Sequence, residues 1–166
     1  MNQNIIGLEF KRELEEEVTA SRKCLERMTE NLFDWKPHDR SMEMGYLAVL
    51  IAEIPKWINI TIEKGEIDFA TWEKYKLAMV EDLLKYFDKN VELAKKSLEN
   101  MSDQALEEMF YLKMNGKELM KSSKKESVSS SIRHWVHHRG QLTVYMRLNN
   151  IPVPSVYGPS ADENTF

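Results

Sequence analysis

The sequence predicts an all-α protein: an up-down four-helix bundle with a short extra helix or hairpin and an extended C-terminal tail. Residues that interrupt helices are few, because the 166 residues include only six glycines and five prolines. The long stretches between the prolines carry apolar residues at the three- and four-residue spacing of amphipathic helices. The length suits one domain, residues 1–166, with a sizeable core.

Composition narrows the class of protein. Hydrophobic residues make up 42% and charged residues 30%, as in a folded globular chain. The net charge is −4 and no basic stripe occurs, so we expect no nucleic-acid partner. We also expect no signal peptide and no membrane span. The single cysteine, Cys24, allows no disulfide within the chain, which suits the cytoplasm, and we expect it to pack inside a helix.

The first half of the chain predicts two helices, over about residues 7–32 and 42–64. Ser41 is the expected N-cap of the second, because a serine side chain can accept a hydrogen bond from a first-turn amide. Pro55 lies inside that helix, removes one internal hydrogen bond and is expected to kink it. Gly65 is expected to end it.

The second half begins with a linker at 66–71, and a third helix is expected from residue 72 or 73 to residue 99 or 100. Ser102 is expected to cap a short helix. Residues 111–123 contain the pair Asn115–Gly116, which favours a small hairpin, although an irregular loop is equally compatible. The serine cluster at 127–131 either lines a pocket mouth or caps or packs the start of the next helix, and we favour capping or packing.

The last helix ends before Pro152, and the proline-rich tail at 152–163 is expected to be extended. An acidic residue at the end of the tail, Asp162 or Glu163, is expected to pair with Arg139 or Arg147. Everything upstream then serves as a scaffold for this helix and its histidines.

His134 and His138 are the candidate metal ligands. They are four residues apart, so their imidazoles lie one turn apart on the same helical face and can share one metal ion. His137 lies about 100° around the helix from His138, which places it at the surface or behind the ligands. A catalytic metal usually has three protein ligands, so a third must come from elsewhere. The alternative is a buried polar pair without metal.

The segment HWVHHRGQLTVYMRLNNIPVPSVYGPSADE, residues 134–163, resembles the C-terminal signature of the DinB-like family. This family of four-helix bundles includes the YfiT-type metal-dependent hydrolases and thiol S-transferases. The shared pattern is H-x3-HRGQL-x2-Y-x-R followed by VP-x2-YGPSADE. A second segment, WKPHDRSMEMGYLAVLIAEIPKW at residues 35–57, resembles the family's first loop and second helix.

The resemblance implies a divalent metal, Zn, Ni or Fe, held by three histidines. Two of them match His134 and His138, and the third belongs to a segment resembling LA-x-H-x-AEIP in the second helix. This chain has LAVLIAEIP there, with Leu50 at the ligand position, and leucine cannot bind a metal. Either Leu50 closes the site, or Glu53 supplies a carboxylate in its place, or His38 reaches in from the preceding loop.

Four further residues are expected to line the pocket or to support the ligands: Leu50, His137, Gln141 and Tyr145. Two functions remain open. The first is a metal-dependent enzyme in which the metal lowers the pKa of a bound water or thiol for hydrolysis or thiol transfer. The second is a metal-free, non-catalytic homodimer that binds a small molecule or serves a structural role. Both predict the same fold.

Overall fold

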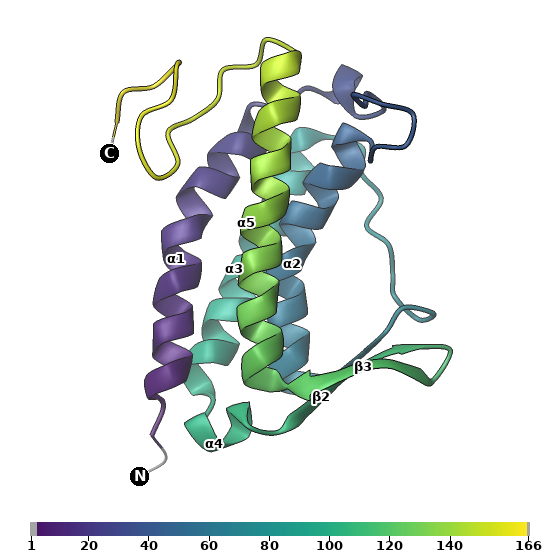
Figure 1. The fold of residues 1–166 in the computed structure, drawn as a ribbon, viewed down its shortest axis with the longest axis vertical. Helices are drawn as coiled ribbons and strands as arrows, with labels where there is room; N and C mark the ends of the chain where they lie inside the picture. Colours follow the sequence, from purple (N-terminus) through teal and green to yellow (C-terminus); the bar gives the residue numbers. More distant parts are fainter. Residues whose placement is uncertain (1–2, 166) are drawn as a thin grey trace.

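The computed structural model, which describes residues 3–165, contains four long helices packed side by side with a small sheet at one end (Figure 1). The elements are α1 (Ile5–Glu26), the short 3-10 helix η1 (Glu30–Leu32), α2 (Met44–Lys64), β1 (Glu66–Asp68), α3 (Val80–Asn100), α4 (Asp103–Leu106), β2 (Met109–Met114), β3 (Lys117–Ser123) and α5 (Lys124–Leu148).

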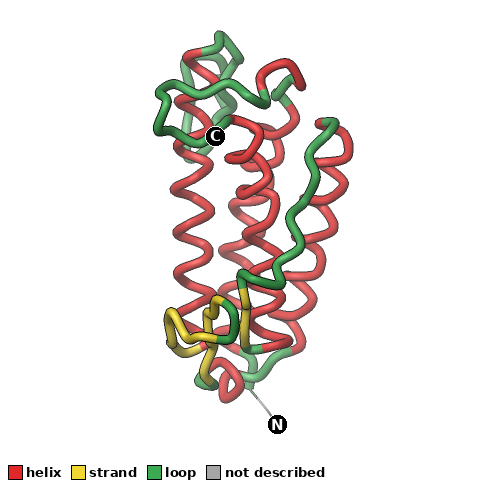
Figure 2. Tube along the Cα trace, turned by 90° about the vertical axis from the view of Figure 1, so that its right-hand side faces the viewer, coloured by secondary structure: helices red, strands yellow, loops and turns green. Residues whose placement is uncertain are grey.

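The directions in which the four long helices run differ from the up-down prediction. α1 packs on α3 and α5, and α2 packs on the same two helices. α2 and α3 run in the same direction. Asn90 donates to the Ala52 carbonyl at 2.9 Å, and two turns further toward the C-terminus of both helices Asn59 donates to Ser97 at 2.7 Å. Residues 69–79 make this possible, because they return in extended form along the helices before α3 begins (Figure 2).

The all-α prediction is also wrong in part, since a three-stranded mixed sheet is present. β1 pairs parallel with β2, and β2 pairs antiparallel with β3. The turn between β2 and β3 has positive φ at Asn115 (51°) and Gly116 (75°), as a tight hairpin requires, so the hairpin alternative is correct. The Asp68 carboxylate accepts from both of these backbone amides, at 3.0 and 2.6 Å. The predicted linker at 66–71 therefore supplies a strand.

Helix boundaries shift where tertiary contacts replace local signals. α1 ends at Glu26 rather than near residue 32. The N-cap of α2 is Glu43, not Ser41, and no side chain caps it. The Met44 amide instead donates to the Trp35 carbonyl at 2.8 Å, so the preceding loop satisfies the helix start. α3 begins at Val80, not at residue 72, and Ser102 caps α4 as predicted.

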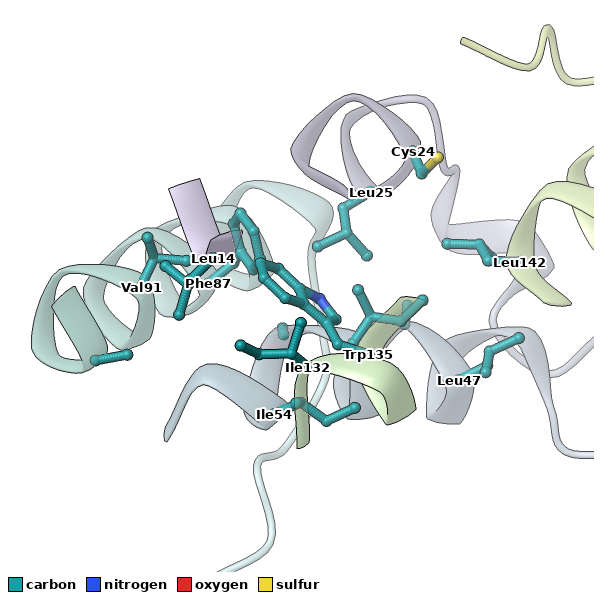
Figure 3. Packing of buried hydrophobic residues seen from close by; sticks show 14 of the residues in the cluster. Leu14, Cys24, Leu25, Leu47, Ile54, Phe87, Val91, Ile132, Trp135 and Leu142 are labelled. Atoms are coloured by element: carbon teal, nitrogen blue, oxygen red, sulfur yellow. The ribbon is translucent and has the colours of Figure 1, made fainter. Parts of the chain in front are cut away.

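The core lies between the four long helices. Figure 3 shows Trp135 of α5 beside Phe87 of α3, with ring centroids 6.0 Å apart. Cys24 is fully buried as expected, and burial raises the pKa of its thiol to about 11, so the thiol is a packing group. α2 is long and apolar enough to span a membrane. However, 61% of its most apolar 18-residue stretch is buried in the protein, so it packs as a core helix.

Ion pairs and hydrogen bonds hold the C-terminal tail against the bundle. Arg147 pairs with Asp162 at 2.6 Å, as predicted. Arg139 does not pair with the acidic end of the tail; it is 2% exposed and forms an ion pair with Glu17 of α1. The hydroxyl of Tyr157 accepts from Arg139 at 2.7 Å and donates to Glu17 at 2.9 Å, so the tail closes this buried pair.

Candidate functional site

His134 and His138 meet on one face of α5, as the sequence predicts. Their Nε2 atoms are 2.6 Å apart, and the Nδ1 of His138 is 2.6 Å from the Oε1 of Gln141. Because an amide oxygen only accepts, His138 donates through Nδ1, and its Nε2 accepts from the Nε2–H of His134. Gln141 thus supports the pair, and both imidazoles are neutral in this arrangement.

The surroundings favour the neutral imidazoles. Burial lowers the pKa of His134, and the nearby imidazoles of His138 and His137 lower it further. Burial also lowers the pKa of His138, although the hydrogen bond to Gln141 opposes part of this effect. A neutral imidazole can accept a hydrogen bond or bind a metal ion.

A cavity of about 790 Å³ lies between α2, the extended segment 69–79 and His134 of α5. Aromatic and apolar side chains form most of its wall, with several carboxylates. Its lining residues are Glu30, Phe33, Asp34, Glu43, Gly45, Tyr46, Val49, Leu50, Glu53, Trp57, Phe69, Trp72, Lys74, Tyr75, Leu77, Met114 and His134. This volume is within the range of small-molecule sites.

Glu53 is a buried carboxylate in that wall, with 6% of its surface exposed. Its Oε1 accepts from the hydroxyl of Tyr86 at 2.9 Å. Burial, followed by the nearby charge of Glu53, raises the pKa of Tyr86, so this phenol stays protonated and continues to donate.

The structure brings together three of the predicted site residues, Leu50, Glu53 and His134, around one cavity. His38 is not among them: it is exposed, and its Nδ1 accepts from the Arg40 backbone amide at 3.1 Å. His137 is exposed, and its ring lies edge-on to that of His138 with centroids 5.1 Å apart. Within residues 3–165, no three His, Cys, Asp or Glu side chains lie close enough to hold one metal ion.

Tyr145 has a structural role. It is buried, donates to the Met42 carbonyl at 3.2 Å and packs edge-on against Trp35, with centroids 5.5 Å apart. It therefore fixes the loop before α2 against α5. It is not among the residues that line the cavity.

The serines at 127–131 do not cap α5, although Ser127 is buried. The cap of α5 is Ser123, which forms a capping box with Glu126. Ser127, Ser130 and Ser131 instead line a second cavity of about 230 Å³, which shares Trp57, Phe69 and His134 with the first. The sequence could have indicated this position, because residues 127, 130 and 131 lie seven, four and three positions before residue 134 and therefore on the same face of the helix.

The aromatic residues of the extended segment 69–79 were not predicted to line a site. Trp72 and Tyr75 fall within the predicted third helix, yet they form one wall of the cavity. Trp72 meets Trp57 edge-on at 6.3 Å, and Trp57 in turn lies 5.6 Å from the His134 ring, measured between centroids. Their spacing is compatible with a helix, so no local signal placed them here.

Comparison with known proteins decides the family. The DinB family model matches residues 1–165. The chain belongs to the DinB family. Over 32 residues it is 53% identical to the uncharacterized protein YrdA of Bacillus subtilis (strain 168), a match that covers 19% of each protein. The chain therefore aligns with less than two thirds of this curated relative.

Solved structures of DinB-like proteins have the same fold. One from Bacillus subtilis, YjoA, has a TM-score of 0.70 at 18% identity, covering 89% of this chain and 97% of that one. One from Bacillus cereus ATCC 10987 has a TM-score of 0.69 at 19% identity, covering 89% and 95%. A third, from Exiguobacterium sibiricum 255-15, has a TM-score of 0.66 at 17% identity, covering 96% and 98%. At these identities the likeness concerns the fold.

Proposed function

We propose that this DinB-family chain is a small-molecule-binding protein that works without a three-histidine metal centre. The observation that carries the proposal is the pairing of Leu50 with a large aromatic cavity: where the family resemblance places a third imidazole, an apolar side chain faces the cavity. The His134–His138 pair then serves as a neutral polar group at the cavity wall.

The donor set supports this proposal. A tetrahedral zinc about 2.0–2.1 Å from each nitrogen would place the two Nε2 atoms about 3.3 Å apart. The observed 2.6 Å needs only a modest outward turn of the rings of His134 and His138, so these two donors fit a metal. The third position does not fit, because Leu50 has no donor atom and, within residues 3–165, no carboxylate completes a group of three possible ligands with the histidine pair.

Metal content and probe binding test the proposal together. In purified, untagged protein we expect far less than one metal per chain after incubation with Zn²⁺ or Ni²⁺, with no difference in His134→Ala or His138→Ala. We expect the neutral fluorophore N-phenyl-1-naphthylamine to bind once per chain, and Leu50→Trp to abolish binding by filling the cavity. Val144→Trp is the matched control, since Val144 is 57% exposed on α5.

One metal per chain that disappears in both histidine variants would overturn the proposal. It would favour a second candidate, a two-histidine, one-carboxylate centre completed by Glu53. The observation in its favour is that Glu53 and His134 line the same cavity. In that case the chain would belong with the metal-dependent hydrolases or thiol S-transferases.

Two further properties complete the proposal. The single cysteine is buried and needs no oxidising environment, which supports a cytoplasmic location. Homodimer formation, as the resemblance to DinB-like proteins implies, is compatible with either function, and size-exclusion chromatography with light scattering would measure it.

A further inference from the structure

Glu53 is a buried carboxylate without a cationic partner. Its side chain receives one hydrogen bond, from Tyr86, and it takes part in none of the salt bridges among residues 3–165. Buried charges in proteins are normally paired, because an isolated one loses its hydration without compensation. A positive group that entered the cavity would supply the missing partner.

The wall around Glu53 is aromatic. Trp57 follows Glu53 by one turn on α2, and Trp72 and Tyr75 line the same cavity from the extended segment. Tyr75 stacks on Tyr86 with centroids 4.1 Å apart, which holds the phenol that donates to Glu53. The faces of such rings carry negative electrostatic potential and attract organic cations.

The ammonium group of Lys56 contacts this aromatic wall. The Nζ of Lys56 lies 4.5 Å from the centroid of the Trp72 ring and 6.0 Å from that of Tyr86. Lys56 comes three residues after Glu53 on α2, yet its ammonium lies over Trp72 and forms no salt bridge with Glu53. The π face of Trp72 is therefore able to hold a cation in this protein.

The charges that line the cavity are mostly negative. Four lining residues are acidic, namely Glu30, Asp34, Glu43 and Glu53, and among the described lining residues only Lys74 is basic. Four carboxylates against the Lys74 ammonium leave a formal excess of three negative charges among the lining residues, and counting the Lys56 ammonium over Trp72 reduces it to two. A concave site with a net negative charge raises the local concentration of positively charged ligands.

We infer that the cavity selects an organic cation, an ammonium group attached to an apolar or aromatic body, with the ammonium at Glu53 between the aromatic side chains of α2 and of segment 69–79. The inference rests on the proposed small-molecule-binding function and names the ligand class of the same site. The cavity volume of about 790 Å³ leaves room for the apolar body beside the ammonium.

Isothermal titration calorimetry with matched probes tests the inference. The probes are benzyltrimethylammonium and its uncharged isostere neopentylbenzene, which differ in charge but hardly in shape. We expect the cation to bind about tenfold or more tightly than the isostere, as a charge-assisted contact in a partly dry site implies. Glu53→Gln should weaken the cation by about the same factor and leave the isostere unchanged.

Two controls keep the result interpretable. The side-chain amide that Glu53→Gln introduces can still accept from Tyr86, so the fold should be retained, and circular dichroism and the melting temperature check this. Trp72→Leu tests the aromatic wall independently, because Trp72 lies in the extended segment outside the helical core; it should weaken the cation more than the isostere.

The outcomes separate this inference from the proposed function. Equal binding of the two probes, or a cation affinity unchanged in both Glu53→Gln and Trp72→Leu, overturns the cation inference while the ligand-binding function stands. Failure of both probes and of N-phenyl-1-naphthylamine to bind overturns the two together. Tighter cation binding that both variants weaken supports the inference.

Discussion

Replacing Leu50 by histidine restores the donor that the family resemblance places there, and we predict that Leu50→His creates a metal site. Leu50 lines the same cavity as His134, whose Nε2 already lies 2.6 Å from that of His138. A third imidazole directed at this pair would complete the three protein donors of a catalytic-type zinc site.

The size of the effect follows from general zinc energetics. Four-ligand structural sites bind zinc with about 10–16 kcal/mol, or about 2.5–4 kcal/mol for each ligand. One added ligand therefore strengthens binding by about two to three orders of magnitude. A small part of this gain is spent in separating the two Nε2 atoms from 2.6 Å to the about 3.3 Å that a shared zinc requires.

Competition titration with a fluorescent zinc chelator measures the affinity of the wild type, Leu50→His and Leu50→His/His138→Ala. Val49→His is the matched control, because Val49 lines the same cavity one residue earlier, about 100° around the helix. We expect the gain in Leu50→His alone. No gain there, or an equal gain in Val49→His or in the double variant, would refute the proposed geometry around the histidine pair.

Two predictions concern stability, measured by urea unfolding. Glu17→Leu leaves Arg139 buried at 2% exposure without its ion-pair partner and should cost about 3–5 kcal/mol, whereas Glu17→Leu/Arg139→Met should recover most of the loss; additive losses would contradict this. Because burial places the pKa values of His134 and His138 below the ordinary 6.5, the unfolded chain binds protons first as the pH falls, so the free energy of unfolding should decrease from about pH 6.5 downward. His134→Gln/His138→Gln should reduce this slope, and an unchanged slope would show that other groups cause it.

Features encoded by neighbouring residues were predictable. The spacing of His134 and His138 places their rings together on any helix, whatever surrounds it. The pair Asn115–Gly116 favours a tight turn because both residues tolerate positive φ, and Ser102 caps its helix through its own side chain. Each of these signals acts over a few residues, so no tertiary partner was needed to identify them.

Features decided by distant contacts were not predictable. Trp72 and Tyr75 carry a spacing that suits a helix, yet their rings pack toward α2 and α3, and the segment stays extended. β1 is three residues long and exists through its parallel pairing with β2. Serines of α5 that resemble a cap line a cavity instead, because Ser123 and Glu126 cap the helix.

The sequence by itself determined the helical segments, the hairpin, the histidine pair and the leucine at position 50, where the family resemblance implies a ligand, since periodicity, turn chemistry and motif spacing are local properties. Only the tertiary structure decided the parallel course of α2 and α3, the cavity between α2 and the extended segment, and the unpaired carboxylate of Glu53 within it. These depend on contacts between residues far apart in the chain, where packing overrides local preference.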